Sequence, residues 1–174
     1  MRFGVNTWVW TSPLTTEELE KLAPHVASLG FDWIEAPLEG LGDLNYREGA
    51  AIIRGHALGV SCCLAMGPDR DLIHPDPAIR DNGMAYVRGS IDATAALGGT
   101  NLVGPLYSAV GRTCQQTPAD RATDLDLLVE NLSALAAYAG DKGVMLGLEP
   151  LNRFETSRPG AERGAPVYRR ALRR

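Results

Sequence analysis

The feature that most constrains the fold is a repeated order in which a helix-like segment ends at glycine and a short strand-like run follows. Glycine just past a helix adopts the left-handed backbone conformation at little cost, so it marks the end of a helix. The order occurs at Gly30, Gly59, Gly98 and Gly143, and the runs that follow are residues 33–35, 60–64, 101–103 and 144–148. With a further run at residues 3–6, the sequence predicts five strands separated by helices.

Apolar residues recur at helical spacing between these strands. One stripe is Leu19, Leu22, Val26 and Leu29, and a later one is Leu125, Leu128, Leu132, Leu135 and Ala139. Another helix is expected to begin at Asp76–Pro77, with the aspartate as its N-cap and the proline in its first turn. The residues that it should bury are Met84, Val87, Ile91 and Ala95. The helix at about residues 43–58 has the weakest pattern.

Strict alternation of strand and helix implies a parallel sheet with right-handed crossovers, either a closed barrel or an open doubly wound sheet. Residues 6–13, after the first strand, contain no glycine-rich phosphate loop. Polar and aromatic residues follow the strands instead, namely Asn6, Trp8, Glu35, Tyr107 and Glu149. They would form the active-site rim of a (β/α)8 TIM barrel. A whole barrel needs roughly 200–250 residues. Because the chain has 174, the expected α/β fold is a barrel truncated to about its first five strands and four helices.

Charge and cysteine content exclude several function classes. Residues 1–156 carry 11 Lys and Arg against 20 Asp and Glu. An acidic body without a basic stripe argues against a nucleic-acid partner, because phosphate neutralisation supplies most of that affinity. No apolar run approaches the ~20 residues of a membrane span, so no membrane partner is expected. The three cysteines have no C-x-x-C spacing, which favours buried thiols in a reducing compartment. We expect a cytoplasmic protein.

Glu149 is the main candidate for chemistry. It ends an apolar strand, and Pro150 then removes a backbone donor, which places a carboxylate at the strand tip facing the barrel mouth. Glu155 follows in the next loop, with Arg153 between the two carboxylates. Spacing alone leaves a second interpretation open, in which Glu149 is a solvated residue or an ion-pair partner of Arg153.

Several sequence motifs carry a family resemblance. They are Gly-Val-Asn at 4–6, Glu-Ala-Pro-Leu at 35–38, Asp-Pro-Ala-Ile-Arg at 76–80, Ala-Leu-Gly-Gly at 96–99, Gly-Pro-Leu-Tyr-Ser-Ala at 104–109 and Leu-Glu-Pro-Leu-Asn-Arg-Phe-Glu-Thr at 148–156. With them, residues 3–156 resemble the sugar phosphate isomerase/epimerase family with its xylose isomerase-like TIM barrel. The resemblance is greatest to ketose 3-epimerases of the tagatose/allulose (psicose) type, and it covers an amino-terminal part only.

The resemblance implies a divalent metal, Mn²⁺ first and Co²⁺ or Mg²⁺ as substitutes, held by Glu, Asp, His and Glu from successive strands. Glu149 matches the first ligand and one of two acid/base carboxylates that move a proton next to the ketone of a sugar substrate through an enediolate. Glu155 matches a substrate contact, Asn6 lines the pocket, and Tyr107 at the rim is a further candidate for substrate binding. The other ligands belong to later strands, so the resemblance implies an impaired or inactive chain.

The histidines do not replace the missing ligands. His25 and His56 fall on expected helices and His74 falls in a loop, so surface or packing roles are expected.

Residues 1–156 are interpreted as the partial barrel domain and residues 157–174 as a divergent tail. The tail is rich in Arg, Pro, Gly and Ala, carries six Arg against one Glu, and lacks apolar periodicity. It is expected to be disordered or to be an out-of-frame reading of GC-rich DNA. We hypothesise a frameshifted or truncated gene product, and sequencing the downstream DNA tests this.

Two alternatives to an epimerase stay open. One is a non-catalytic remnant or interaction protein whose open barrel edges pair, giving a homo-oligomer. The other is a different xylose isomerase-like enzyme, such as a hydroxypyruvate or inositol-pathway isomerase. The Asn-Arg-Phe-Glu-Thr run at 152–156 favours the sugar epimerase.

Overall fold

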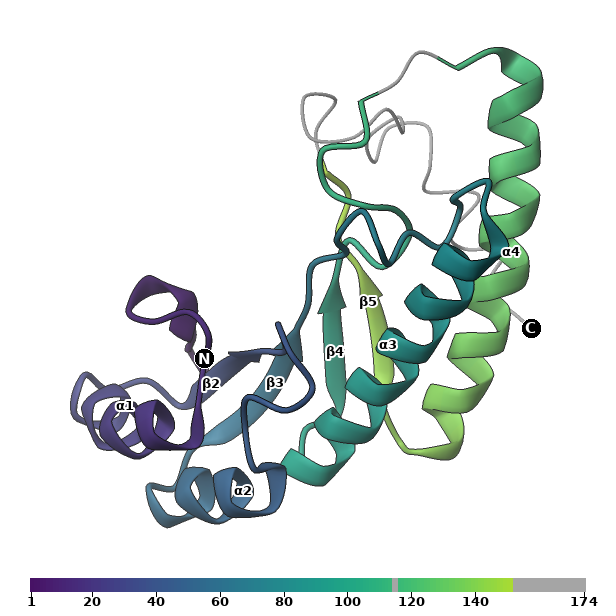
Figure 1. The fold of residues 1–174 in the computed structure, drawn as a ribbon. Helices are drawn as coiled ribbons and strands as arrows, with labels where there is room; N and C mark the ends of the chain where they lie inside the picture. The colour runs from purple at the N-terminus through teal and green to yellow at the C-terminus, as the bar shows by residue number, and fades with distance from the viewer. Residues whose placement is uncertain (114–115, 152–174) are drawn as a thin grey trace.

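The structure, a computed structural model, describes residues 1–113 and 116–151. Its centre is a parallel five-stranded sheet whose strands lie in sequence order, β1-β2-β3-β4-β5 (Figure 1). The strands are β1 Gly4–Asn6, β2 Trp33–Pro37, β3 Gly59–Cys63, β4 Asn101–Gly104 and β5 Met145–Leu148. The helices are η1 Thr7–Val9, a 3-10 turn, then α1 Thr16–Ser28, α2 Tyr46–Gly55, α3 Pro77–Leu97 and α4 Pro118–Asp141. Each crossover advances to the next strand, as in a barrel and unlike a doubly wound sheet, so the predicted fold is confirmed.

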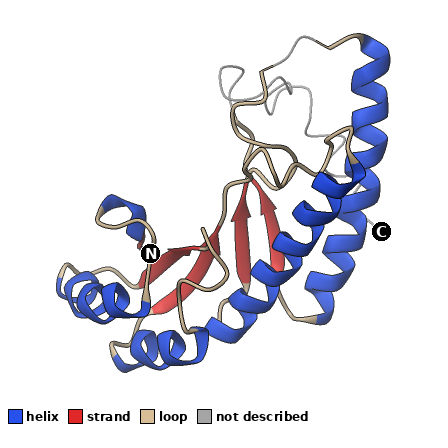
Figure 2. Ribbon diagram, in the orientation of Figure 1, coloured by secondary structure: helices blue, strands red, loops and turns tan. Residues whose placement is uncertain are grey.

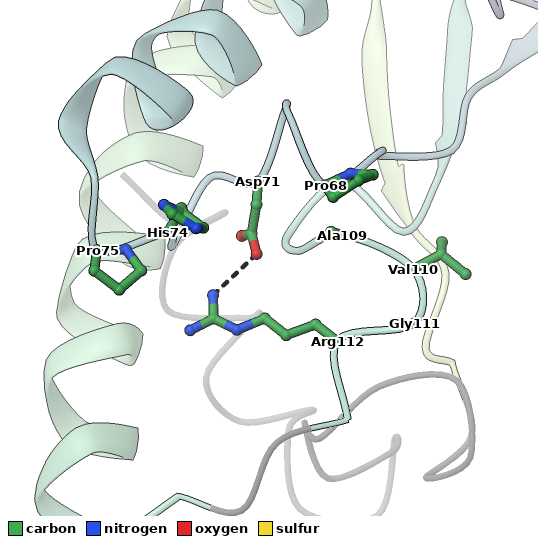
Figure 3. A pocket seen from close by; sticks show the side chains of 8 residues that line it. All are labelled: Pro68, Asp71, His74, Pro75, Ala109, Val110, Gly111 and Arg112. Carbon is green, nitrogen blue, oxygen red and sulfur yellow. Dashed lines mark hydrogen bonds and ion pairs between the residues drawn. The ribbon is translucent and has the colours of Figure 1, made fainter.

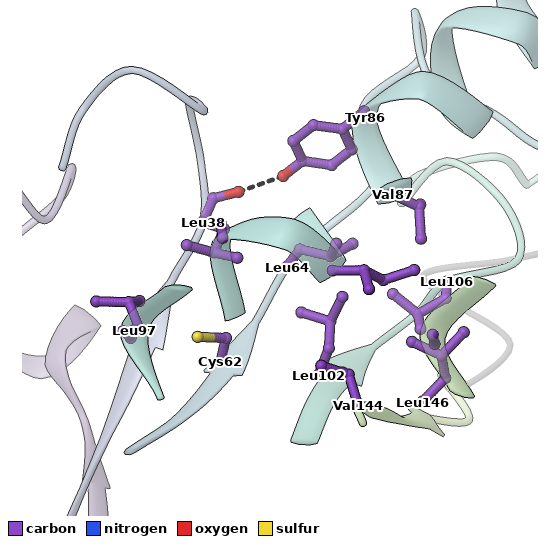
Figure 4. Packing of buried hydrophobic residues seen from close by; sticks show 14 of the residues in the cluster. Leu38, Cys62, Leu64, Tyr86, Val87, Leu97, Leu102, Leu106, Val144 and Leu146 are labelled. Atoms are coloured by element: carbon purple, nitrogen blue, oxygen red, sulfur yellow. Dashed lines mark hydrogen bonds between the residues drawn. The ribbon is translucent and has the colours of Figure 1, made fainter. Parts of the chain in front are cut away.

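The α-helices all lie along one side of the curved sheet (Figure 2). The strand residues that face them are apolar and form the core. Ile34 pairs in register with Val60, and Ala36 pairs with Cys62, which in turn pairs with Leu102. These side chains are buried together with residues of α3 such as Val87 and Leu97 (Figure 4). We call this side of the sheet the covered face.

The opposite side, which we call the inner face, consists of the alternate strand residues. One register layer is Gly4, Trp33 and Gly59, the next is Asn6, Glu35 and Ser61, and a third includes Cys63, Val103 and Gly147. Most of these residues are partly exposed, and Met145 on the same face is 67% exposed. In a TIM barrel this face lines the barrel interior.

The helix ends follow the predicted signals at most positions. Gly30, Gly98 and Gly143 have φ of 83°, 85° and 70°, the left-handed values that the sequence pattern predicts. Asp76 caps α3, with its Oδ1 accepting a hydrogen bond from the Ala78 N–H at 2.9 Å, and Pro77 follows in the first turn.

Gly59 is a correction to the predicted helix ends. It is the first residue of β3, and Ala57 takes the left-handed conformation after α2 with φ of 57°. Glycine is required at position 59 for another reason, because a Cβ there would lie 2.6 Å from the indole ring of Trp33. Leu29 is a second correction. It is 54% exposed, since it follows the last residue of α1 at the helix C-cap.

Some sequence predictions fall outside the described residues. They concern Cys114, Arg153, Glu155 and the boundary between residues 156 and 157. None of the helices in residues 1–113 and 116–151 combines the length and the apolarity that crossing a membrane requires.

Candidate functional site at the carboxyl ends of the strands

Glu149 lies immediately after β5, at the edge of the sheet where all five strands end. Its backbone N–H donates to the carbonyl of Gly104 at 2.9 Å, which extends the pairing of β5 with β4 by one residue. Its side chain is exposed, and Pro150 follows. The backbone of Glu149 is therefore fixed by the sheet while its carboxylate stays accessible to a ligand.

Tyr107, which follows β4, is connected to the segment after Glu149. Its side chain is 1% exposed, and its hydroxyl accepts a hydrogen bond from the backbone N–H of Leu151 at 2.9 Å. Tyr107 and Glu149, two predicted site residues, thus lie on neighbouring segments, because β4 and β5 are parallel and paired and so end at the same edge of the sheet. The Tyr107 hydroxyl acts on the backbone that carries Glu149, a contact that the sequence does not reveal.

Asn6, at the end of β1, is the centre of a small hydrogen-bonded group on the inner face. Its side-chain amide donates to Glu35 Oε1 at 2.8 Å and to Cys63 Sγ at 3.2 Å. Its Oδ1 accepts from the backbone N–H of Trp8 at 2.8 Å and so begins the η1 turn. Burial and the neighbouring negative charge of Glu35 raise the pKa of the Cys63 thiol, which keeps it protonated.

The segment after β1 presents aromatic rings beside this group. Trp8 and Trp10 are exposed. The Trp8 indole N–H donates to Glu39 Oε1 at 2.8 Å, and the Ser12 hydroxyl donates to Glu39 Oε2 at the same distance. Glu39 therefore ties the segment after β1 to the segment after β2. Trp8 therefore presents an exposed ring in a fixed orientation at this edge of the sheet.

An ion-pair group joins the loops after β3 and β4. The guanidinium of Arg112 donates to Asp71 Oδ2 at 2.9 Å and lies 3.5 Å from Asp124 Oδ2 on α4. Asp71 is buried and also accepts from the Ile73 N–H. Figure 3 shows Asp71 and Arg112 pointing toward each other. Both residues line a pocket of about 340 Å³, which His74 also lines. These contacts hold two loops of the barrel rim in one arrangement.

The described residues do not form a complete metal site. Within residues 1–113 and 116–151, no three His, Cys, Asp or Glu side chains gather closely enough to hold a metal ion. Glu149 offers a carboxylate of the kind that hard divalent cations prefer, but such cations need several oxygen or nitrogen ligands. His25 lies on α1 and His56 at the end of α2, both exposed, as predicted, and the His25 ring packs edge-on against Trp10. Glu155 lies outside the described residues.

Parallel strands in sequence order, helices on one side and polar side chains at the strand ends together define a βα-barrel protein. The chain belongs to the family of xylose isomerase-like TIM barrels, whose model matches residues 24–164.

The relatives of this chain are ketose 3-epimerases. It is 29% identical over 157 residues to the L-ribulose 3-epimerase of Methylomonas sp., covering 90% of this chain and 54% of that one. It is 34% identical to the D-psicose 3-epimerase of Agrobacterium fabrum, covering 89% and 54%. The crystal structure of a Methylomonas D-allulose 3-epimerase in complex with D-allulose matches with a TM-score of 0.89 at 27% identity, over 100% of this chain and 59% of that one.

The chain thus spans little more than half the length of these relatives. The resemblance inferred from the sequence motifs is confirmed. Ketose 3-epimerases are isomerases of carbohydrate metabolism.

Proposed function

We propose that this chain forms the part of a ketose 3-epimerase that carries its first five strands, and that its substrate is a sugar of the ketohexose or ketopentose class. The observation that carries the proposal is the position of Glu149. It stands at the carboxyl end of β5, with its backbone bonded to Gly104 and its carboxylate exposed at the mouth. The names of the relatives and their structural match support a ketose as the ligand of this mouth.

In this proposal Glu149 exchanges a proton with C3 of the ketose. Its carboxylate takes the proton from C3, the electron pair of the broken C–H bond forms the C2–C3 double bond, and the carbonyl oxygen becomes an enediolate oxygen. A second carboxylate on the opposite face of the sugar then returns a proton to C3 and inverts it. Asn6, Tyr107 and Glu155 are proposed to contribute to substrate binding, Tyr107 by fixing the Leu151 backbone.

We also propose Mn²⁺ as the metal of this enzyme, with Co²⁺ or Mg²⁺ as substitutes and Glu149 as one ligand. The metal, when bound, would polarise the ketone. The described residues supply this one ligand at the mouth and do not by themselves hold the ion. Residues 152–174 add Glu155 and Glu162 but no Asp or His. We therefore expect the 174-residue chain to be impaired in turnover.

The test is exchange of the C3 proton in deuterium oxide, followed by NMR with D-fructose, D-allulose and D-tagatose in the presence of Mn²⁺. We expect slow exchange by the parent chain and none by Glu149→Gln. Glu48→Gln, which removes an exposed carboxylate at the start of α2, is the charge-matched control and should exchange like the parent. Exchange that persists in Glu149→Gln contradicts the role of Glu149. A parent chain that neither exchanges C3 nor binds any of the sugars contradicts the proposal.

A second candidate is a non-catalytic chain that associates through its sheet. Within the described residues, β1 and β5 each have one neighbouring strand, and Met145 is exposed on the inner face. Unpaired strand edges template association with other strands. Light scattering after size exclusion distinguishes the candidates, since a homo-oligomer that binds no ketose favours the second.

A further inference from the structure

The inner face of the sheet is mostly neutral. Its described strand residues are glycines, amides, a hydroxyl, a thiol, a proline and apolar side chains, and Glu35 is the charged one among them. It lies at the middle of β2, in the register layer of Asn6 and Ser61 and next to the layer of Cys63. Its carboxylate therefore belongs to the face that lines the barrel interior. This corrects the sequence prediction, which placed Glu35 beyond the end of its strand, because β2 continues to Pro37.

Glu35 is held in a defined orientation. Its Oε1 accepts a hydrogen bond from the Asn6 amide at 2.8 Å. Asn6 in turn is fixed by the Trp8 N–H at its Oδ1 and by its contact with Cys63. The carboxylate is thus positioned by a side chain whose own donors and acceptor are all engaged, which is the arrangement expected of a preorganised binding group.

The Glu35 carboxylate is partly exposed on the inner face, so it is accessible to hydrogen-bond donors other than its protein partners. A carboxylate can accept about four hydrogen bonds. Asn6 supplies one amide donor, and the Cys63 thiol is a second side-chain partner. Capping of the η1 turn does not require Glu35, because Asn6 caps that turn with its own Oδ1. The donors that would complete the shell of Glu35 are O–H groups, which a polyol chain supplies in number.

We propose that Glu35 is a substrate-binding residue that accepts a hydrogen bond from one hydroxyl group of the ketose, on the inner face of the sheet whose carboxyl edge carries Glu149. The inference rests on the proposed ketose site and adds to it a second carboxylate with a binding role. Glu35 recognises a hydroxyl of the sugar, and Asn6 is the positioning residue that orients it.

The experiment measures dissociation constants by ligand-observed NMR for D-allulose and a panel of its singly deoxygenated analogues. The proteins are the parent chain, Glu35→Gln, Glu35→Ala and the charge-matched control Glu48→Gln. Thermal unfolding is followed for each. We expect Glu35→Ala to weaken D-allulose binding about tenfold, the loss expected for a hydrogen bond to a charged group. Glu35→Gln should lose less, and the control should match the parent.

The analogues separate binding from a structural role. For one analogue, the parent chain should lose affinity relative to D-allulose, while Glu35→Ala should bind that analogue and D-allulose equally. A merely structural role would weaken all sugars by one factor and leave this difference intact, which would overturn the proposal. Unchanged D-allulose affinity in both Glu35 variants would also overturn it and leave the ketose site standing. A parent chain that binds none of the sugars would overturn the ketose site and the role of Glu35 together.

Discussion

The covered face and the inner face are built from alternating residues of the same strands, yet they are assembled by different physical means. On the covered face, Ile34, Cys62 and Leu102 are apolar, buried and packed against helices. On the inner face, Asn6 and Glu35 are polar, partly exposed and joined by a hydrogen bond. Cys62 and Cys63 are neighbours in sequence and face opposite sides. The comparison teaches that one face provides stability and the other is free to carry recognition.

The largest expected effect is loss of packing on the covered face. Leu102→Ala should lower the free energy of unfolding by about 2–5 kcal/mol, because Leu102 is fully buried and its truncation leaves a cavity. Met145→Ala, on the inner face and largely exposed, is the control and should change it by less than about 0.5 kcal/mol. Urea unfolding of both variants measures the difference. Equal losses of unfolding free energy in the two variants would contradict the difference in packing between the covered face and the inner face.

Arg112→Met should have the next largest effect. It leaves the buried Asp71 carboxylate without its guanidinium partner and should cost about 2–3 kcal/mol of unfolding free energy. Asp71→Asn in the Arg112→Met background should recover part of the loss, because it removes the unpaired charge. A double-mutant cycle in urea checks this. A coupling near zero would show that the two rim loops are held by other contacts.

Gly59→Ala tests the close contact between position 59 and the Trp33 ring on the inner face. The added methyl would lie 2.6 Å from the indole carbons, so we expect a loss of about 1–3 kcal/mol. Gly55→Ala in α2 is the matched control. A Cβ at Gly55 meets open space, and the helix propensity of alanine should stabilise the chain by about 0.5–1 kcal/mol. If Gly59→Ala behaves like Gly55→Ala, the position of the Trp33 ring is wrong.

The smallest expected effect is the pH dependence that the two thiols contribute. Burial raises the pKa of Cys62 to about 11 and also raises that of Cys63. Above the ordinary thiol pKa of 9.0, the unfolded chain loses these protons while the folded chain retains them, so stability falls as pH rises further. Below that pH both thiols are protonated in the folded and the unfolded chain, so they add no pH dependence to the free energy of unfolding. Replacing either cysteine by Val should flatten the decline in urea midpoints, and an unchanged slope would count against the buried thiols.

Local signals in the sequence predict much of the fold, but not the contacts of the site. Gly30 and Asp76 define helix ends by backbone chemistry that is readable without a partner. The need for glycine at position 59 cannot be read from the local sequence, because it comes from the Trp33 ring on the neighbouring strand. The Asn6–Glu35–Cys63 contacts likewise depend on the register of three strands. Glu149 could be predicted, since its strand and Pro150 are adjacent, whereas the bond between Tyr107 and Leu151 depends on how two loops pack.

The most direct test of a ketose site on the inner face is a titration of the isotopically labelled chain with D-allulose, followed by protein-observed NMR. The account predicts that the side-chain amide of Asn6 and the indole N–H group of Trp8 shift in a saturable manner. Backbone amides of the covered-face core, such as those of Ile34 and Leu102, should stay in place apart from small through-strand changes. Shifts confined to the helices, or no saturable shifts at all, would contradict the account.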